Sequence, residues 1–146
     1  GLIMVDLPPE EDDELCDPAR TAGLHWIRLV TPTTNKDRLS DVLANSSGFV
    51  YYVSIAGITG TQSAGAASIE KAVHQIKTKS DLPVAVGFGI KTREQVKEIG
   101  NIAEGVVVGS VIVNEIEQNL DANGQPKAGL VESVISLVRS LATDSI

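Results

Sequence analysis

The sequence contains little cysteine and few basic residues, and each shortage excludes a kind of protein. Its one cysteine, Cys16, allows neither an intramolecular disulfide nor a cysteine-rich metal site. With 12 lysines and arginines against 19 aspartates and glutamates, the formal net charge is −7. Since no basic patch can release counterions, we expect neither nucleic acid nor anionic membranes among its partners.

The sequence also lacks metal-ligand patterns, membrane-spanning runs and aromatic residues in number. His25 and His74 have no cysteine or carboxylate at metal-ligand spacing, so no metal site is predicted. No apolar run approaches the length of a transmembrane helix, and residues 1–10 lack the basic region of a signal peptide. We therefore expect a cytoplasmic protein. Aromatic residues make up 3% of the chain, so its core is expected to consist of aliphatic side chains.

What is present is an alternation of short apolar runs and helical segments. The continuous apolar runs, which are typical of strands buried on both faces, are residues 2–5, 26–30, 49–54, 83–86 and 105–108. The helical segments are residues 8–22, 36–44, 68–79, 92–99, 111–120 and 128–141. Residues 55–67, rich in Gly, Ser, Thr and Ala, are predicted to form a loop. The order predicts an α/β fold with a parallel sheet, in one domain over residues 1–146.

The neighbours of several residues in the sequence predict whether their side chains are exposed or buried. The acidic run of residues 10–13 follows Pro8 and Pro9 and is predicted to be a solvated helix start, where negative charge meets the helix dipole. Gly23 is a candidate helix cap, and Cys16 is expected to pack within its helix. Tyr51 and Tyr52 follow each other on a strand, so they are expected to face opposite sides of the sheet.

Three glycine-containing turns follow predicted strands: Gly57 to Gly60, Gly87 to Gly89, and Gly109-Ser110. The carboxyl ends of parallel strands share one edge, which is where such folds bind ligands. Glycine allows backbone N–H groups to approach an anion, and Gly109-Ser110 also opens a helix. The turns predict a phosphate site. The alternative is that each glycine only makes a tight turn, and none of them matches a P-loop.

Asp6 ends the first predicted strand and is expected at the same edge. A carboxylate there could act as an acid or base, or it could orient a loop. It could equally cap the helix that begins at Pro8 and Pro9.

Five segments resemble the fourth to eighth strands of tryptophan synthase α-subunits, in order and over essentially the whole chain. They are residues 1–11, Thr31-Pro32-Thr33, residues 48–60, residues 82–90 and residues 105–110. The resemblance implies a partial (β/α)8 TIM barrel with about five strands. It also implies retro-aldol cleavage of indole-3-glycerol phosphate to indole and glyceraldehyde 3-phosphate. This subunit would need no cofactor, and indole would pass to a β-subunit that uses pyridoxal phosphate.

The resemblance also implies roles for single residues. Those implied to hold the substrate phosphate are Gly60, Gly89, Gly109 and Ser110. Those implied to line or close over the substrate pocket are Phe49, Tyr51, Thr59 and Phe88. Phe49 stands where family members often carry tyrosine, and Thr59 matches a loop threonine linked to closure. Asp6 matches a rim aspartate with a supporting role.

This chain departs from the family pattern in its catalytic residues. The family's catalytic glutamate lies on the second strand and its catalytic aspartate in the loop that follows, whereas the resemblance of this chain begins at the fourth strand. No catalytic residue is therefore assigned here. Each such group typically contributes a factor of about 10² to 10⁴ to the reaction rate, so we expect little or no turnover. We also expect this chain alone to bind phosphate weakly.

Three functions remain open from the sequence. The first is an α-subunit enzyme whose carboxylates come from outside these residues. The second is a non-catalytic phosphate-binding half-barrel that forms a homo-oligomer, because the outermost strands of a five-stranded piece expose unpaired edges. The third is another phosphate-binding barrel, such as an isomerase or cyclase of histidine or tryptophan synthesis. A doubly wound open sheet also remains possible from the strand pattern alone.

Overall fold

The computed structural model describes residues 1–54, 62–87 and 89–142, and is built on one parallel sheet. Its strands lie in the order β1-β2-β3-β4-β5, so each one pairs with its neighbour along the chain. They are β1 (Leu2–Ile3), β2 (Trp26–Val30), β3 (Val50–Val53), β4 (Val84–Gly87) and β5 (Gly105–Val107). Each predicted run overlaps its strand, and the predicted parallel βα repeat is confirmed.

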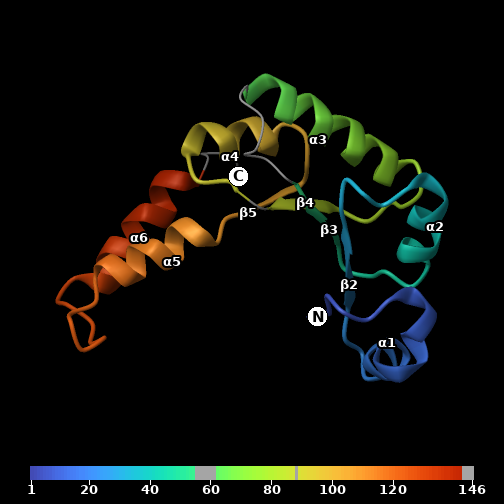
Figure 1. The fold of residues 1–146 in the computed structure, drawn as a ribbon, viewed down its shortest axis with the longest axis horizontal. Coiled ribbons are helices and arrows are strands. Elements are labelled where there is room, and N and C mark those ends of the chain that lie inside the picture. Colours follow the sequence, from blue (N-terminus) through green and yellow to red (C-terminus); the bar gives the residue numbers. More distant parts are fainter. Residues whose placement is uncertain (55–61, 88, 143–146) are drawn as a thin grey trace.

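The helices alternate with these strands (Figure 1). They are a 3₁₀ turn η1 (Pro9–Glu11), α1 (Asp12–Thr21), α2 (Lys36–Ala44), α3 (Gln62–Lys77), α4 (Arg93–Gly100), α5 (Ser110–Gln118) and α6 (Leu130–Leu141). The prediction that residues 55–67 form a loop is wrong from Gln62 onward, where α3 already begins. That stretch contains several alanines, the best helix former, and its small polar residues conceal this propensity. Among the described residues, no helix is long and apolar enough to cross a membrane.

Capping residues set the start of α4 and the end of α1. Thr92 caps α4 in a reciprocal capping box with Gln95, which stabilises the first turn. Gly23 ends α1 with φ 78°, and the Leu24 N–H donates to the Ala19 carbonyl at 3.0 Å. This left-handed glycine cap is the one predicted from the sequence.

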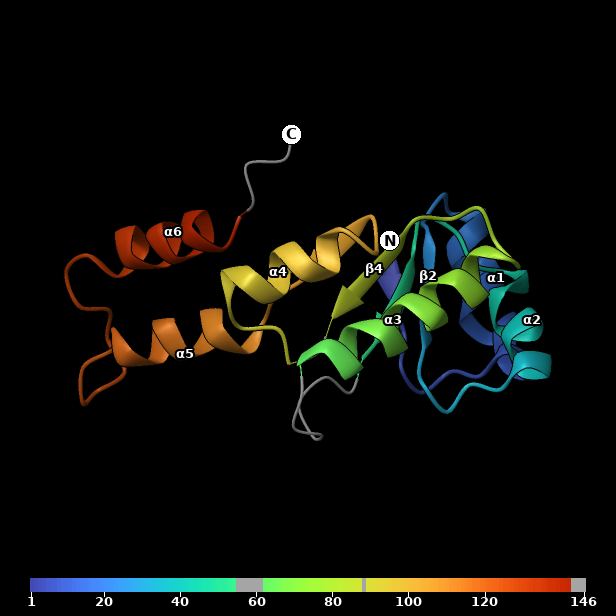
Figure 2. The same ribbon diagram turned by 90° about the horizontal axis from the view of Figure 1, so that it is seen from above.

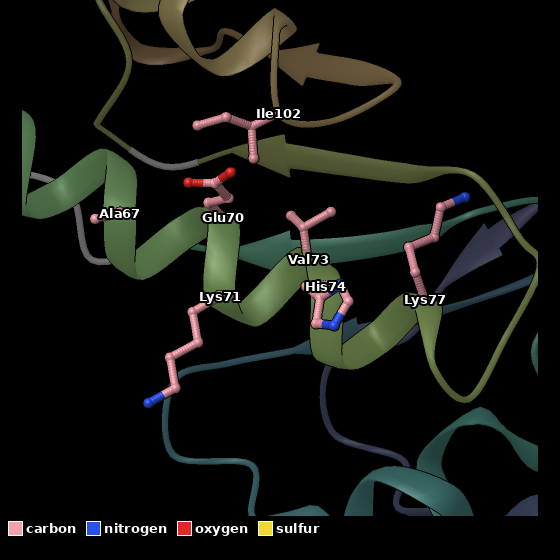
Figure 3. A pocket seen from close by; sticks show the side chains of 7 residues that line it. All are labelled: Ala67, Glu70, Lys71, Val73, His74, Lys77 and Ile102. Carbon is pink, nitrogen blue, oxygen red and sulfur yellow. The ribbon is translucent and has the colours of Figure 1, made fainter.

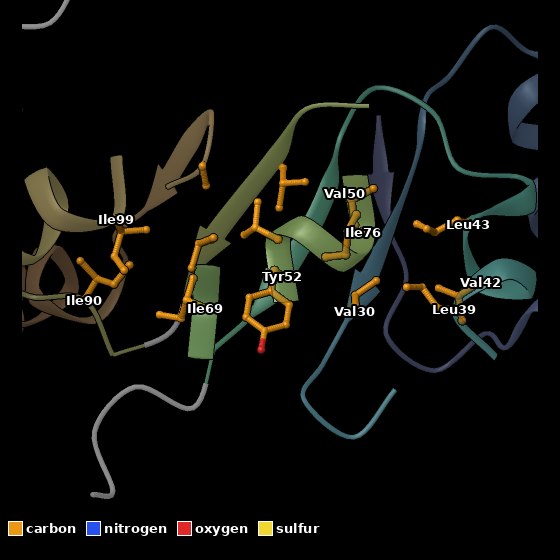
Figure 4. Packing of buried hydrophobic residues seen from close by; sticks show 14 residues of the cluster. Val30, Leu39, Val42, Leu43, Val50, Tyr52, Ile69, Ile76, Ile90 and Ile99 are labelled. Atoms are coloured by element: carbon orange, nitrogen blue, oxygen red, sulfur yellow. The ribbon is translucent and has the colours of Figure 1, made fainter. Parts of the chain in front are cut away.

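The main core lies between the sheet and helices α2, α3 and α4. Tyr52 of β3 is 2% exposed and packs with Ile69 and Ile76 of α3 (Figure 4). Tyr51 is only half-buried, so the two tyrosines face opposite sides of the sheet as predicted. The helices therefore cover one face of the sheet, and the face that carries Tyr51 is the less buried one.

A smaller core joins α1 to β2 and includes Cys16, Ala19 and Trp26. Cys16 is completely buried, which confirms the prediction that it packs. Burial and the nearby Asp12 carboxylate raise the pKa of the Cys16 thiol, so it is a poor nucleophile.

The prediction that Asp12 belongs to a solvated helix start is wrong. Asp12 is 8% exposed and forms a buried ion pair with Arg28 of β2. Its second carboxylate oxygen accepts a hydrogen bond from Asn45 Nδ2 at 2.8 Å. A charge is rarely buried without a partner, and the partner here lies 16 residues further along the chain.

The sheet is open at both ends within the described residues. β1 pairs with β2, β5 pairs with β4, and neither has a second neighbour in the sheet. Helices α5 and α6 lie side by side and extend beyond the β5 end of the sheet (Figures 1 and 2). The molecule is thus an open, curved section of a parallel αβ fold.

Candidate functional site

The candidate site is the edge of the sheet where β3, β4 and β5 end. Val53 pairs with Gly87, and Gly87 pairs with Val107, so the three strands end side by side. The predicted glycine turns follow these strand ends. Gly87, Gly89 and Gly109-Ser110, which the structure describes, therefore lie at one edge of the sheet. Gly60, Thr59 and Phe88 lie outside the described residues.

Tyr51 and Gly87 make a close contact on the face of the sheet opposite helices α2, α3 and α4, which we call the inner face. A Cβ atom added to Gly87 would lie 2.2 Å from the Tyr51 hydroxyl oxygen and 3.1 Å from Cβ of Val107. Only glycine leaves room for the tyrosine ring across the end of β4. The ring is therefore held beside the turn that carries the predicted phosphate ligands.

Ser54 joins the ends of β3 and β4. It is 2% exposed, and its hydroxyl donates to the Gly87 carbonyl at 3.0 Å. The Ser54 N–H donates to the same carbonyl at 2.9 Å. Sequence reasoning did not single out this residue. The available signal was a serine placed directly after an apolar strand, at the edge where ligands bind.

The turn after β5 leads directly into a helix. Gly109 is the N-cap of α5, without a side-chain cap, and its carbonyl accepts from the Ile112 and Val113 N–H groups at 2.9 and 3.1 Å. The N–H groups of the first turn of a helix have no partner within that helix and favour an anion. Gly109 and Ser110 are both exposed, so these groups are accessible.

Gly89 follows the end of β4 and is also exposed. Its φ of 78° lies in the left-handed region, which glycine adopts without strain. The position therefore requires glycine for its backbone, whether or not it also contacts a ligand.

Phe49 lies at the other end of β3, one residue before the strand begins. It shares a strand face with Tyr51 by alternation, yet it is separated from the carboxyl edge by the length of β3. The structure therefore places Phe49 deeper along the inner face than Tyr51.

Asp6 lies in the exposed loop after β1. It does not cap the following turn, because the N-cap of η1 is Pro8. Arg28 fixes this loop by donating to the Leu7 carbonyl at 2.8 Å. A cavity of about 360 Å³ adjoins the loop and is lined by Asp6, Arg28 and Arg38 among others.

Arg38 also binds the other end of this loop. Its guanidinium donates to both carboxylate oxygens of Glu10, at 2.7 and 3.1 Å. These hydrogen bonds hold the pKa of Glu10 below its ordinary value, so the exposed pair stays charged near neutrality.

A larger hollow of about 530 Å³ lies away from this edge, along helix α3 and next to Ile102 (Figure 3). It is lined by Glu70, Lys71, His74 and Lys77, with Ala67 and Val73. His74 is exposed. The described residues contain no cluster of three or more His, Cys, Asp or Glu that could hold a metal ion. This hollow belongs to the helical layer and not to the strand-end site.

Comparisons with known proteins agree on one family. A family model described as "Tryptophan synthase alpha chain" matches residues 1–141. Tryptophan synthase subunit alpha from Campylobacter jejuni superposes with a TM-score of 0.82 at 30% identity, over 97% of this chain and 53% of that chain. A tryptophan synthase alpha chain from Legionella pneumophila gives a TM-score of 0.74 at 36% identity, over 95% and 49%.

A tryptophan synthase structure from Mycobacterium tuberculosis has a TM-score of 0.77 at 34% identity, over 97% of this chain and 49% of that chain. The chain therefore spans about half the length of these relatives. The relatives are TIM barrels, which assigns the five parallel strands to such a barrel rather than to a doubly wound open sheet.

Proposed function

This chain belongs to the tryptophan synthase alpha chain family, and from that premise we propose that it supplies the phosphate-binding half of an α-subunit that cleaves indole-3-glycerol phosphate. Gly89, Gly109 and Ser110, together with Gly60, would hold the phosphate. Tyr51, with Phe49, Thr59 and Phe88, would line the pocket for the rest of the substrate. Asp6 would support the rim.

The retro-aldol reaction explains what this half can and cannot contribute. The bond that breaks joins indole C3 to the first glycerol carbon. C3 must gain a proton, and the hydroxyl on that carbon must lose one as it becomes the aldehyde. We assign both transfers to carboxylates outside these residues, on the second strand of the family barrel and in the loop after it. The groups in this chain would bind and orient the substrate, which needs no titrating side chain.

One observation carries the proposal: the ends of β3, β4 and β5 lie side by side, with the N-terminus of α5 opening directly at Gly109-Ser110. Backbone N–H groups and a helix dipole can bind a dianion in a chain whose net charge is −7, because their field is local. A tryptophan synthase β-subunit is the partner that family membership favours.

The experiment is a titration of the ¹⁵N-labelled chain with glycerol 3-phosphate, followed by amide NMR. We expect saturable shifts at Gly89, Gly109 and Ser110. Ser110→Asp should abolish them, because it places a negative charge where the phosphate would bind. Ser140→Asp adds the same charge at an exposed position on α6 and should leave them unchanged. Shifts that avoid these amides, or that survive Ser110→Asp, would reject the site.

The second candidate is a non-catalytic half-barrel that binds phosphate and associates with itself. The open edges of β1 and β5 favour it, since unpaired strands recruit other strands. Self-association through these edges stays a prediction. It differs from the first candidate in one measurable respect, because it requires a stable oligomer of this chain alone.

A further inference from the structure

A pocket of about 150 Å³ lies on the helical side of the sheet, between the loop after β2 and helix α3. Its apolar wall includes Val30, Leu39 and Ile76, which belong to the main core. The volume suffices for several water molecules, and therefore for a small ligand. None of the residues assigned to the substrate of the strand-end site lines this pocket, so it needs an account of its own.

The Tyr52 hydroxyl is a buried donor at this pocket. Tyr52 lines the pocket and is 2% exposed. Within the described part of the chain no hydrogen bond engages its hydroxyl, which Figure 4 shows directed away from Val50 and Ile76. Burial raises the pKa of Tyr52, so the hydroxyl keeps its proton near neutrality and can donate it. Buried polar groups normally have a hydrogen-bond partner, so this one indicates a partner that the chain does not supply.

Lys71 brings a positive charge to the same pocket. It lies on α3 and lines the pocket together with Gln75, one helical turn further along. Its side chain points away from Ile102, across the larger hollow (Figure 3). None of the ion pairs between described residues includes Lys71. No described aspartate or glutamate lines the pocket, so its local charge is positive although the chain carries −7.

The hydroxyls on the opposite wall are already engaged with one another. Thr31 Oγ1 lies 2.8 Å from Thr33 Oγ1, and the Thr31 N–H donates to Thr34 Oγ1 at 3.1 Å. The donors that remain for a ligand are therefore the Tyr52 hydroxyl, the Lys71 ammonium and the Gln75 amide.

We propose that this pocket binds a short aliphatic carboxylate. The Lys71 ammonium and the Tyr52 hydroxyl would each donate to a carboxylate oxygen, and Val30, Leu39 and Ile76 would surround the aliphatic chain. Hydrogen bonds to a charged group are the stronger kind, and a carboxylate accepts at both of its oxygens. A phosphate group presents three acceptor oxygens and more charge, which suits this partly apolar pocket less well. The ligand would join the loop after β2 to α3.

The test is a titration of the ¹⁵N-labelled chain with sodium butyrate at constant ionic strength, followed by amide NMR. We expect saturable shifts at Thr34, Lys71 and Gln75. Lys71→Gln and Tyr52→Phe should each weaken binding by about tenfold, because each removes one donor to a charged group. Lys79→Gln removes the same charge at an exposed position just after α3 and should leave binding unchanged.

Three results would overturn the proposal. The first is a set of shifts that survives Tyr52→Phe, and the second is equal weakening by Lys79→Gln and Lys71→Gln. The third is equal binding of butylamine, which has the same aliphatic chain and the opposite charge, or tighter binding of inorganic phosphate at the same amides. The first two would reject the donors, and the third would reject the carboxylate as the ligand class.

Urea unfolding provides a second measurement. Because the Tyr52 hydroxyl has no partner in the described chain, Tyr52→Phe should leave the unfolding midpoint without butyrate unchanged or higher. Butyrate should raise the midpoint of the wild type and of Lys79→Gln, and raise that of Tyr52→Phe much less, because a ligand stabilises the state that binds it. A lower midpoint of Tyr52→Phe without butyrate would overturn the proposal, since the hydroxyl would then have a partner within the protein.

Discussion

At the scale of single residues, the buried pair of Asp12 and Arg28 holds the loop after β1 in place. Arg28 pairs with Asp12 on one side and donates to the Leu7 carbonyl on the other, and its guanidinium lies 5.4 Å from the centre of the Trp26 ring. The Asp6 loop is therefore attached to β2 through a buried charge.

Removing the carboxylate should unfold the chain more easily. Asp12→Ala leaves the Arg28 guanidinium buried without its partner, which we expect to lower the free energy of unfolding by about 3–5 kcal/mol. Asp13→Ala changes an exposed carboxylate in the same helical turn and should cost well under 1 kcal/mol. Urea unfolding of both variants measures the difference. Equal losses would mean that the buried pair contributes little.

Gly87 provides a second prediction, because its missing side chain makes room for Tyr51. In Gly87→Ala the new methyl would overlap the tyrosine hydroxyl and crowd Val107. We expect a loss of about 1–3 kcal/mol in the free energy of unfolding, together with a changed environment of the Tyr51 ring. Gly109→Ala is the matched control, since a Cβ there meets nothing within 4 Å and its φ is −124°. An unchanged tyrosine signal in Gly87→Ala would refute the contact.

Gly87 and Asp12 differ in how much of their surroundings the sequence predicts. The need for glycine at the strand end was predictable from the turn that follows, although its packing against Tyr51 was not. The burial of Asp12 was not predictable either, because four acidic residues in a row at a helix start are normally solvated. Only the fold brings Arg28 beside one of them.

At the scale of elements, Glu104 joins the end of α3 to β4. Its carboxylate accepts from the Lys77 ammonium at 2.5 Å and from the Val84 N–H at 2.8 Å. Partial burial raises the pKa of Glu104, but these hydrogen bonds lower it by more, so the pKa lies below its ordinary value. The carboxylate therefore stabilises the fold above that ordinary pKa, and the contribution is lost as the pH falls through the lowered one.

The prediction concerns the pH dependence of stability. Glu104→Gln keeps an acceptor for the Val84 N–H and removes the charge. The stability difference between wild type and this variant should be largest near neutrality and should shrink below about pH 4.5. It should be modest, since both side chains of the ion pair are partly exposed and screened. Denaturant unfolding between about pH 7 and pH 3 measures it. A difference that stays constant with pH would contradict the assignment.

The elements also show where periodicity is informative. The helix of residues 36–44 was predicted with its observed bounds. The structure adds that the Asn35 side chain caps it by accepting from the Arg38 N–H. The start of α3 was missed, because alanine, glycine and serine give no apolar period. Helix α6 was predicted within residues 128–141, but the exposure of Val131, Ile135 and Val138 was not, since an apolar residue in a sequence does not show which side of the helix is covered.

At the scale of the whole molecule, the parallel direction of the strands was predictable from the sequence pattern, and their order and closure were not. Short crossovers and continuous apolar strands favour a parallel sheet, but a doubly wound sheet, whose strands are not in chain order, fits the same pattern. Five strands alone do not show whether the sheet closes, and the family relation is what assigns it to a barrel. The phosphate-binding half and the proton-transferring half of the proposed site would lie on different parts of that barrel.

The most direct test of this account is the release of indole from indole-3-glycerol phosphate, measured for the chain alone and after refolding with the amino-terminal segment of the Campylobacter jejuni subunit. The account predicts no release above buffer by the chain alone, and release by the refolded mixture that is lost with Ser110→Asp. Indole release by the chain alone, sensitive to Ser110→Asp, would contradict it, because the chain would then contain its own acid and base.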